Sequence, residues 1–335
     1  MPCPPVWFDW RIITMPTSSD LRVLIADDIA AAGVERLRAV AQVDVDAEIT
    51  AAQLLSRIHG YHALVVRSRT KVDSALLAAA AQLRVVGRAG VGVDNVDVEA
   101  AAARSVIVVN SPLAATTAVA ELTLALMLAV ARQVPLADAA MKQGEWPKKK
   151  LQGAELEGKT LGLIGFGRIG REVARRAQVF GMRIVAYEIV PIDPASVAHL
   201  ATLLELQQVL AAADYISLHV PVTNATRNII DAPALASCKP GVRIVCTARG
   251  GLIDEAALLS ALESGRVAAA GLDVFATEPP GASALVRHPQ VVAMPHVGAQ
   301  TAEAQERAGV DIGDEVAAAL TGKPLRWRVL PDPAG

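Results

Sequence analysis

The chain has 335 residues, of which 53% are hydrophobic and 20% are charged, and its formal net charge is −2. This composition is typical of a globular protein, and the length exceeds one typical core, so we expect two domains. Nucleic-acid binding requires a clustered excess of Lys and Arg, so the near balance of charges argues against a nucleic-acid partner.

Cysteine spacing and apolar runs exclude two further classes of protein. The three cysteines, Cys3, Cys238 and Cys246, form no Cys-x-x-Cys pair, so neither a metal site nor a disulfide framework is indicated. The longest apolar run, residues 122–131, has about half the length of a membrane span. We therefore expect a protein with no metal and no membrane partner, located in the cytoplasm, where thiols stay reduced.

The N-terminal segment, residues 1–19, differs in composition from the rest of the chain. It is rich in Pro and Trp and has no continuous apolar stretch, which argues against a signal peptide. We expect it to be a disordered extension, with regular structure beginning at Leu21.

Short apolar strands alternate with alanine-rich helices through the first third of the chain. Strands are predicted at residues 21–26, 63–67, 85–88 and 106–110, and helices at residues 30–40, 75–81 and 98–103. Alternation of this kind, with strands rich in Val and Ile, predicts a parallel sheet covered by helices.

A long helix at residues 119–132 precedes a second α/β series. Its strands are predicted at residues 159–165, 183–187, 215–219, 242–246, 269–273 and 291–293, and a last long helix at residues 301–320. This is a complete doubly wound series. The predicted fold class is therefore α/β, with two doubly wound parallel-sheet domains.

A glycine motif, GFGRIG, directly follows the strand at residues 159–165 and opens a helix. Gly165 permits a tight turn, Gly167 lets a pyrophosphate approach the backbone, and Gly170 lets helix and strand pack closely. The helix N-terminus offers unpaired N–H groups to the phosphates. Glu188 lies eighteen residues after Gly170, at the end of the next strand, where it can bind both ribose hydroxyls and repel a 2′-phosphate. The motif predicts an NAD site, with His219, at the end of a further strand, as another cofactor-binding candidate.

Three polar segments, residues 247–254, 271–279 and 295–299, each follow a predicted strand. Ligands of open α/β sheets bind outside the carboxyl ends of the strands, so the three segments can converge on one cleft. Oxidation of a 2-hydroxy acid needs a cation for the carboxylate and a base for the hydroxyl proton. The candidates are a bidentate arginine, a histidine that titrates near working pH, a carboxylate that orients it, and an acid that holds the nicotinamide carboxamide: Arg249, His296, Glu278 and Asp273.

Taken singly, these residues also fit ordinary structural roles. An arginine after a strand often forms a surface ion pair, and a Pro-His pair often forms a turn with a satisfied imidazole. Their occurrence together, behind a dinucleotide motif, favours catalysis.

The catalytic segments resemble those of the D-isomer-specific 2-hydroxyacid dehydrogenases, and the likeness runs from about Leu21 to Leu320. Other stretches are similar to the phosphoglycerate dehydrogenase branch of that family: VVRSRTKV (65–72), VVGRAGVGVDNVD (85–97), MKQGEW (141–146) and LEGKTLGLIGFGRIGREVA (156–174).

The resemblance implies a role for individual residues. Arg249, Glu278 and His296 match the family's substrate-binding arginine, orienting glutamate and acid–base histidine, and Asp273 matches the aspartate near the nicotinamide. The residues that match backbone contacts to the pyrophosphate are Arg168 and Ile169. The residues that match the carboxylate-binding loop are Gly90, Val91 and Gly92. The residues that match the far end of the substrate pocket are Arg67, Ser68 and Arg88.

The resemblance also implies a discontinuous architecture. A Rossmann NAD-binding domain, residues 116–299, is inserted into a flavodoxin-like substrate domain made of residues 20–115 and 300–330. Residues 122–131 and 133–153 match the subunit-contact region, so we expect a homodimer or homotetramer. We expect no regulatory domain after Leu330.

The expected reaction is the NAD-dependent oxidation of 3-phosphoglycerate to 3-phosphohydroxypyruvate, which opens serine biosynthesis. Two departures leave the substrate open: Leu113-Ala114-Ala115 replace residues of the Asn-Gly-Asn type, and Cys246 stands where Asn is usual. Alternatives in the same class are glyoxylate, hydroxypyruvate, sulfolactate or another 2-hydroxy acid. An alternative from a different class is an NAD-sensing transcriptional co-repressor. The sequence has no basic or disordered interaction arm apart from residues 1–19, which argues weakly against this alternative.

Basic residues follow the second and third predicted strands of the first series. We expect Arg67 and Arg88 to face a phosphate at the far end of the pocket. Arg69 and Lys71 are expected to be solvated surface charges.

Overall fold

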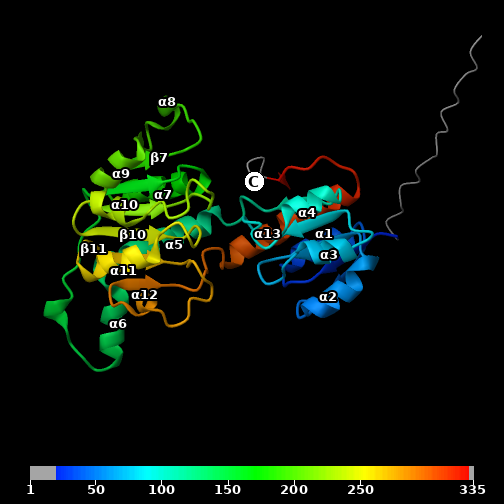
Figure 1. Ribbon diagram of the computed structural model, residues 1–335, viewed down its shortest axis with the longest axis horizontal. Helices are drawn as coiled ribbons and strands as arrows, with labels where there is room; N and C mark the ends of the chain where they lie inside the picture. The colour runs from blue at the N-terminus through cyan, green and yellow to red at the C-terminus, as the bar shows by residue number, and fades with distance from the viewer. Residues whose placement is uncertain (1–19, 332–335) are drawn as a thin grey trace, which may run out of the picture. The chain divides into compact units, whose positions relative to one another are not determined.

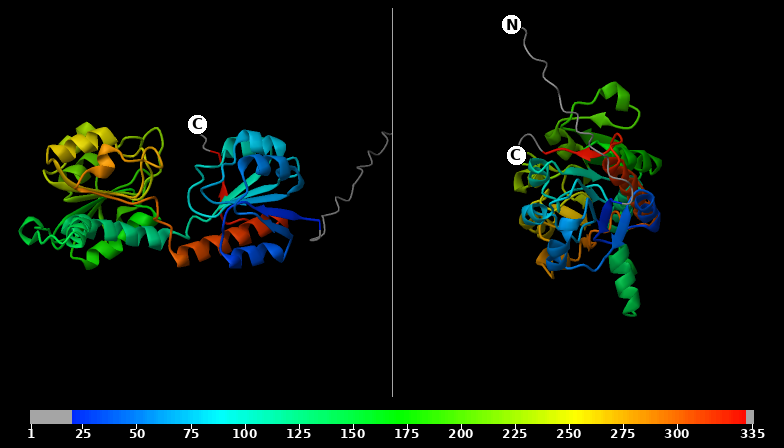
Figure 2. Two further views of the ribbon diagram at one scale, coloured as in Figure 1. Left: turned by 90° about the horizontal axis from the view of Figure 1, so that it is seen from below. Right: turned by 90° about the vertical axis from the view of Figure 1, so that its right-hand side faces the viewer.

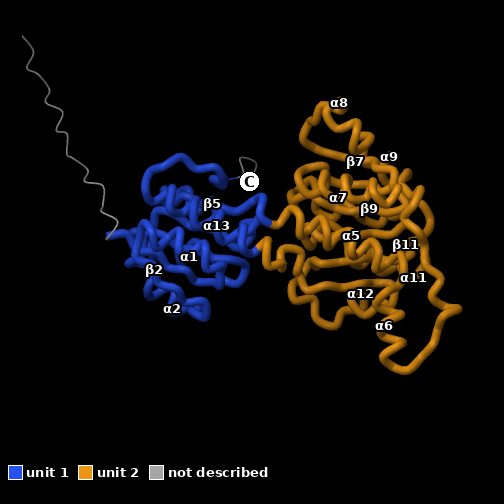
Figure 3. The backbone as a smooth tube through the Cα atoms, turned by 180° about the vertical axis from the view of Figure 1, so that it is seen from behind, with its two compact units in different colours: residues 1–114, 305–335 blue, residues 115–304 orange. Residues whose placement is uncertain are grey.

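The computed structural model describes residues 20–331 (Figure 1), so the extension expected at residues 1–19 lies outside the described residues. The chain forms two compact units (Figure 3). One comprises Met1–Ala114 and Gln305–Gly335, and the other, inserted between them in sequence, comprises Ala115–Ala304. The boundaries expected from the sequence were 115/116 and 299/300.

The first unit is built on a six-stranded sheet in the order β13-β5-β4-β3-β1-β2. Strands β1 to β5 run parallel, and β13 pairs antiparallel with β5. The parallel order 2-1-3-4-5 is that of flavodoxin-like folds. The strands are β1 (Arg22–Ile25), β2 (Gln42–Val45), β3 (Ala63–Val66), β4 (Val85–Arg88), β5 (Ile107–Asn110) and β13 (Arg328–Val329). The helices are α1 (Ala31–Arg38), α2 (Ala51–Arg57), η1 (Ile58–Gly60), α3 (Ser74–Ala79), α4 (Val98–Ala103) and α13 (Ala302–Leu320).

Both faces of this sheet are covered by helices (Figure 2). Leu24, on β1, faces a core shared with α2, α3 and α4. Its neighbours Val23 and Ile25 face a second core shared with α1 and α13. Successive strand residues point to opposite faces, so a sheet buried on both sides needs the continuous apolar strands seen in the sequence.

Helices α1 and α13 touch through glycines. A Cβ atom on Gly33 would lie 2.2 Å from the carbonyl oxygen of Gly309, and one on Gly313 would lie 2.7 Å from the carbonyl oxygen of Gly33. Because the backbones are in contact, no side chain fits between them. This packing ties the C-terminal helix to the first helix of the same unit.

The second unit is built on a seven-stranded parallel sheet in the order β12-β11-β10-β9-β6-β7-β8. Counted within the unit, this contains the Rossmann order 3-2-1-4-5-6 with one further strand. The strands are β6 (Thr160–Ile164), β7 (Arg183–Tyr187), β8 (Thr202–Leu203), β9 (Tyr215–Leu218), β10 (Val242–Cys246), β11 (Val267–Leu272) and β12 (Val291–Ala293). The helices are α5 (Thr116–Arg132), α6 (Val134–Lys142), η2 (Lys148–Lys150), α7 (Arg168–Val179), α8 (Pro194–Val197), α9 (Leu206–Ala212), α10 (Ala232–Ser237), α11 (Glu255–Glu263) and α12 (Ala284–Arg287).

Two hydrophobic cores flank this second sheet. Helices α5 and α7 cover one face. Helices α9, α10, α11 and α12 cover the other. The fold class expected from the sequence, two α/β units with parallel sheets, is confirmed.

Among the described residues, no single helix is long and apolar enough to cross a membrane. Helices α5 and α6 meet the criteria of length and composition only as a pair, with a bend of 64° between them.

The contact between α1 and α13 predicts the effect of one added methyl group. Gly33→Ala should destabilise the first unit by about 1–3 kcal/mol, because the new Cβ meets a backbone carbonyl that cannot rotate away. Gly60→Ala is the matched control, since the nearest atom to its Cβ is a side-chain nitrogen of Arg22 at 3.5 Å. Thermal unfolding of both variants measures the difference. Equal melting temperatures would contradict the close packing.

Candidate active site

The glycine motif forms a tight connection between β6 and α7. Gly165 has φ of +98°, and a Cβ there would lie 2.6 Å from the carbonyl oxygen of His219. A Cβ on Gly170 would lie 2.3 Å from the carbonyl oxygen of Gly165. A Cβ on Gly167, by contrast, would have no atom of the described chain within 4 Å apart from its own residue and the two chain neighbours. The loop is therefore closely packed beneath and open at the N-terminus of α7, where unpaired N–H groups favour an anion.

Glu188 directly follows β7 and is fixed beside this loop. Its Oε2 accepts a hydrogen bond of 2.6 Å from the backbone N–H of Phe166, and its Oε1 accepts one of 3.1 Å from that of Val190. Each carboxylate oxygen can accept further hydrogen bonds. Residues 189–194 contain no Arg or Lys. At the position where the dinucleotide ribose is expected, the site therefore presents the carboxylate of Glu188. Residues 189–194 add no cation there.

His219 lies directly after β9, behind the glycine loop. Its Nε2 is 2.9 Å from Ser217 Oγ. Its buried Nδ1 has no hydrogen-bond partner in the described part of the chain. Burial lowers the pKa of His219 to about 4, so the ring is neutral near pH 7. His219 thus lies under the loop that is expected to bind the cofactor. Its backbone carbonyl oxygen packs against Gly165.

Strands β10, β11 and β12 are neighbours in the sheet, so the segments that follow them start at one edge. Two of the expected catalytic side chains meet there. The Nδ1–H of His296 donates a 2.7 Å hydrogen bond to Glu278 Oε2, and Glu278 Oε1 accepts a 3.1 Å bond from the N–H of Phe275. The imidazole Nε2 has no partner among residues 20–331, and the side chain is 48% exposed. This leaves Nε2 available to a substrate.

Asp273 holds the loop that carries His296. Its side chain is fully buried, and its two oxygens accept 2.8 Å hydrogen bonds from the N–H groups of Val297 and Gly298. Its carbonyl oxygen accepts a 2.9 Å bond from the N–H of His296. Burial raises the pKa of Asp273, and the two backbone hydrogen bonds oppose that change. Because both oxygens are engaged by backbone, its position fixes the backbone of His296, which has φ of +53°.

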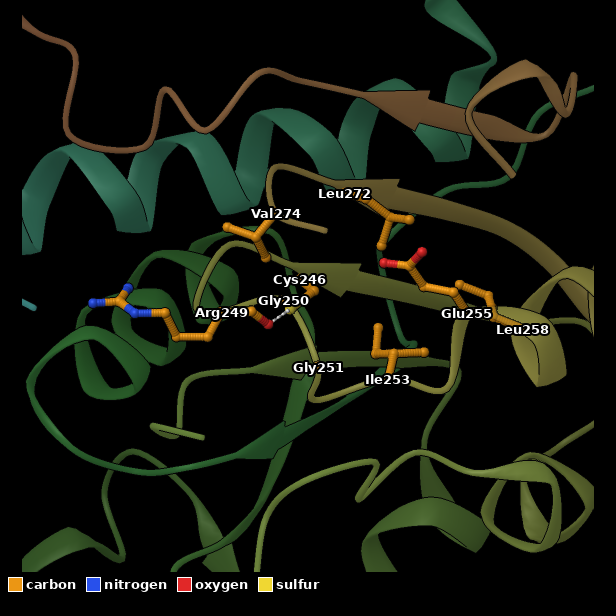
Figure 4. Close-up of a pocket in the computed structure, with 9 residues that line it drawn as sticks. All are labelled: Cys246, Arg249, Gly250, Gly251, Ile253, Glu255, Leu258, Leu272 and Val274. Carbon is orange, nitrogen blue, oxygen red and sulfur yellow. Dashed lines mark hydrogen bonds between the residues drawn. The ribbon is translucent and has the colours of Figure 1, made fainter. Parts of the chain in front are cut away.

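Arg249 follows β10, and its loop touches the loop after β11. A Cβ on Gly250 would lie 1.8 Å from the carbonyl oxygen of Phe275, so only glycine fits between the two backbones. The Nη1–H of Arg249 donates a 2.7 Å bond to the carbonyl of Ala248. In Figure 4 the guanidinium points away from the small cavity behind its loop. That cavity measures about 10 Å³, room for one water molecule at most.

Cys246 lies behind the same loop. Its Sγ donates a weak hydrogen bond, 3.6 Å long, to the carbonyl oxygen of Arg249 (Figure 4). Burial raises the pKa of this thiol to about 11, so it stays protonated near pH 7. The cysteine therefore supports the Arg249 backbone and is not a reactive thiolate.

The remaining expected site residues lie together in the first unit, at the carboxyl ends of β3 and β4. Val66 is paired with Arg88 in the parallel register, and Arg67 and Ser68 follow directly. Gly90 has φ of +147°, and a Cβ there would lie 1.8 Å from Nη1 of Arg88, so the guanidinium lies over this glycine.

Two further features differ from expectation or from the family pattern. Arg69 is not simply a solvated charge, because its Nε lies 3.0 Å from Oδ1 of the buried Asp27. Leu113 is 41% exposed, whereas Ala114 and Ala115 are buried.

Comparison with known proteins places these features in a family. Residues 124–298 match the model of the D-isomer specific 2-hydroxyacid dehydrogenase, NAD binding domain. The chain is 50% identical over 302 residues to the D-3-phosphoglycerate dehydrogenase of Mycobacterium tuberculosis, an alignment that covers 90% of this chain and 57% of the relative. The chain thus spans a little over half the length of the curated relatives it matches.

Solved structures agree over nearly the whole chain. A protein from Thermus thermophilus superposes with a TM-score of 0.85 at 36% identity, covering 92% of this chain and 100% of that one. A glyoxylate reductase from Paecilomyes thermophila superposes with a TM-score of 0.86 at 33% identity, covering 94% and 99%. With the family model matched as well, the chain belongs to the D-isomer-specific 2-hydroxyacid dehydrogenase family.

Proposed function

We propose that this protein oxidises 3-phosphoglycerate to 3-phosphohydroxypyruvate with NAD, the first step of serine biosynthesis. The observation that supports the reaction class is the 2.7 Å hydrogen bond between His296 Nδ1 and Glu278 Oε2, which leaves Nε2 available. The name of the 50% identical relative supports the substrate.

His296 acts as the base in this reaction. Its Nε2 accepts the proton of the C2 hydroxyl as C2 gives up its hydrogen as hydride. Glu278 stabilises the imidazolium that forms, since an adjacent carboxylate favours the charged ring. When bound, the nicotinamide supplies the hydride acceptor. In the reverse direction the imidazolium returns the proton to the ketone oxygen.

Arg249, in the second unit, is a proposed partner of the substrate carboxylate. The planar guanidinium of Arg249 suits a bidentate contact with a substrate carboxylate. Residues 90–92, in the first unit, offer backbone N–H groups. Asp273 positions the loop of His296. Its side chain is fully buried and both of its oxygens bind backbone N–H groups, which does not favour the contact with the nicotinamide carboxamide expected from the sequence.

NAD is the proposed cofactor. The glycine loop fits a pyrophosphate, since the position above Gly167 is open and the α7 N-terminus follows it. Residues Gly165, Gly170, Arg168 and Ile169 shape that site, His219 supports it, and Glu188 binds the ribose hydroxyls. A carboxylate there repels the 2′-phosphate of NADP.

A phosphate at C3 of the substrate is the proposed partner of Arg67, Ser68 and Arg88. Arg67 emerges from the buried strand β3 and Ser68 is exposed.

The runner-up function is the reduction of glyoxylate or a related 2-keto acid. The superposed glyoxylate reductase and the apolar Leu113-Ala114-Ala115 segment favour it.

We also propose a cytoplasmic homodimer or homotetramer. Helix α6 has no buried residue in the single chain, and Val134, Met141 and Trp146 expose 51%, 52% and 76% of their surfaces. Apolar side chains at this exposure, close together in sequence, favour a subunit contact. Cys238 and Cys246 are free thiols, which agrees with a reducing compartment.

Loss of the base should abolish most turnover. His296→Ala should lower kcat by roughly 10²–10⁴-fold, the usual contribution of general acid–base catalysis. Glu278→Gln should also lower kcat, because Nδ1 of His296 loses the carboxylate that accepts its hydrogen bond and orients the ring. Steady-state rates from pH 5 to pH 10 measure both effects. His199→Ala, at an exposed histidine of the same unit, is the control. Near-normal kcat in His296→Ala would refute the assignment.

The carboxylate of Glu188 predicts cofactor preference. The kcat/KM for NAD should exceed that for NADP by roughly tenfold or more, the effect of about 1.4 kcal/mol. Glu188→Ala should reduce this preference, since it removes both the ribose contact and the repulsion of the 2′-phosphate. Initial rates of NADH and NADPH formation measure it. A wild-type enzyme that uses both cofactors equally would contradict the role of Glu188.

Arg67 predicts substrate choice. Arg67→Ala should lower kcat/KM for 3-phosphoglycerate by roughly 10- to 150-fold, the value of a charge-assisted hydrogen bond of about 1.5–3 kcal/mol. The rate on unphosphorylated glycerate should be unchanged. Lys71→Ala, an exposed cation on the same loop, is the control. An equal loss on both acids, or a wild type that prefers the unphosphorylated acid, would favour the runner-up function.

A further inference from the structure

A buried carboxylate binds the loop at residues 67–70, which follows β3. Asp27 is 3% exposed. Its Oδ2 accepts hydrogen bonds from the backbone N–H groups of Arg67, at 2.5 Å, and Thr70, at 3.2 Å. Its Oδ1 accepts bonds from the hydroxyl of Thr70, at 2.7 Å, and from Nε of Arg69, at 3.0 Å. Asp27 thus gathers four donors from three residues of one short loop.

Asn95 binds the carbonyl groups of the same loop. Its Nδ2 donates to the carbonyl oxygen of Arg67 at 2.7 Å and to that of Thr70 at 2.6 Å. The peptide groups at both ends of the loop are therefore held, N–H by Asp27 and C=O by Asn95. These two residues lie far from the loop in sequence and belong to separate segments of the first unit.

The middle of the loop is left open by this arrangement. In the part of the chain that the structure describes, the backbone N–H groups of Ser68 and Arg69 have no hydrogen-bond acceptor. Ser68 is exposed, and its hydroxyl is also without a partner there. Successive N–H groups in a tight loop form a concavity that favours an anion.

The charge of Asp27 is compatible with an anion nearby. A carboxylate directly under such a loop would repel a phosphate if it were not compensated. Here it accepts four hydrogen bonds, one of them from the Arg69 guanidinium, which offsets the buried charge. Asp27 is too deeply buried to contact a ligand itself.

We propose that Asp27 and Asn95 are positioning residues that hold the loop at residues 67–70 in the shape that receives the distal anionic group of the substrate. This rests on the proposed function, in which that group is a phosphate. Asp27 and Asn95 contribute to binding of the phosphorylated substrate only through Arg67, Ser68 and their backbone.

The test compares substrate-selective kinetics of three full-length variants. Asp27→Asn puts an amide nitrogen where an oxygen accepts hydrogen bonds. Asn95→Ala removes the two bonds to the carbonyl groups and keeps Asp27 intact. Glu48→Gln is the control, an exposed carboxylate of the same unit with no hydrogen bond in the described structure. For each variant, kcat and KM are measured with 3-phosphoglycerate, glycerate and NAD, together with amide hydrogen exchange of residues 67–70.

Asp27→Asn and Asn95→Ala should each raise KM for 3-phosphoglycerate by roughly ten- to a hundredfold, while kcat changes by less than about threefold. The KM values for glycerate and NAD should stay within about twofold of the wild type. Exchange should quicken at residues 67–70 and stay unchanged in the second unit. A merely structural role would instead lower activity with both acids in proportion to lost folded protein.

Three results would overturn the proposal. They are an equal rise of KM for both acids, a fall of kcat with KM unchanged, and unaltered exchange at residues 67–70 in both variants. If Asp27→Asn does not fold, Asn95→Ala decides alone. A wild type that does not prefer 3-phosphoglycerate over glycerate refutes the proposed function, and the phosphate assignment with it. That result is read from the wild type, so it is distinguishable from failure of the positioning variants.

Discussion

The catalytic edge of the second unit depends on the buried carboxylate of Asp273. An ionised group without exposure to solvent persists only when donors surround it, and here the donors are the N–H groups of Val297 and Gly298. These N–H groups belong to the loop that carries His296. The same interaction that satisfies a buried charge therefore fixes the backbone from which the imidazole reaches Glu278.

Asp27 in the first unit, like Asp273, is a buried carboxylate whose hydrogen bonds come from a neighbouring loop. Each aspartate lies just beyond the carboxyl end of a buried strand, β1 or β11, and each binds the backbone of a segment that follows another strand of the same sheet. Parallel sheets place all such segments at one edge. A buried acid at that edge orders irregular backbone that has no sheet or helix of its own to satisfy it.

Much of the fold could be predicted from the sequence, because buried strands and amphipathic helices carry strong patterns. The bounds of α4, β7, β10 and β12 agree with those expected. The strands β2, β8 and β13 were not predicted, since they are edge strands of two to four residues that are partly exposed. Helix α6 was not predicted either, because it buries none of its residues within the chain and so has no apolar face set by the core.

The sequence by itself determined the chemistry available to this protein: a glycine motif with an acid after the next strand, and an arginine, a glutamate and a histidine after three further strands. These are local patterns, and spacing along the chain is sufficient to recognise them. Only the tertiary structure decided which atoms pair, because those contacts join distant segments. Glu278 takes the Nδ1 of His296 and leaves Nε2 available, and Asp27 binds a loop forty residues away. No local pattern marks Asp27 or Asn95 as a partner of that loop, since a lone Asp or Asn after a strand looks the same whether it faces solvent or holds a loop.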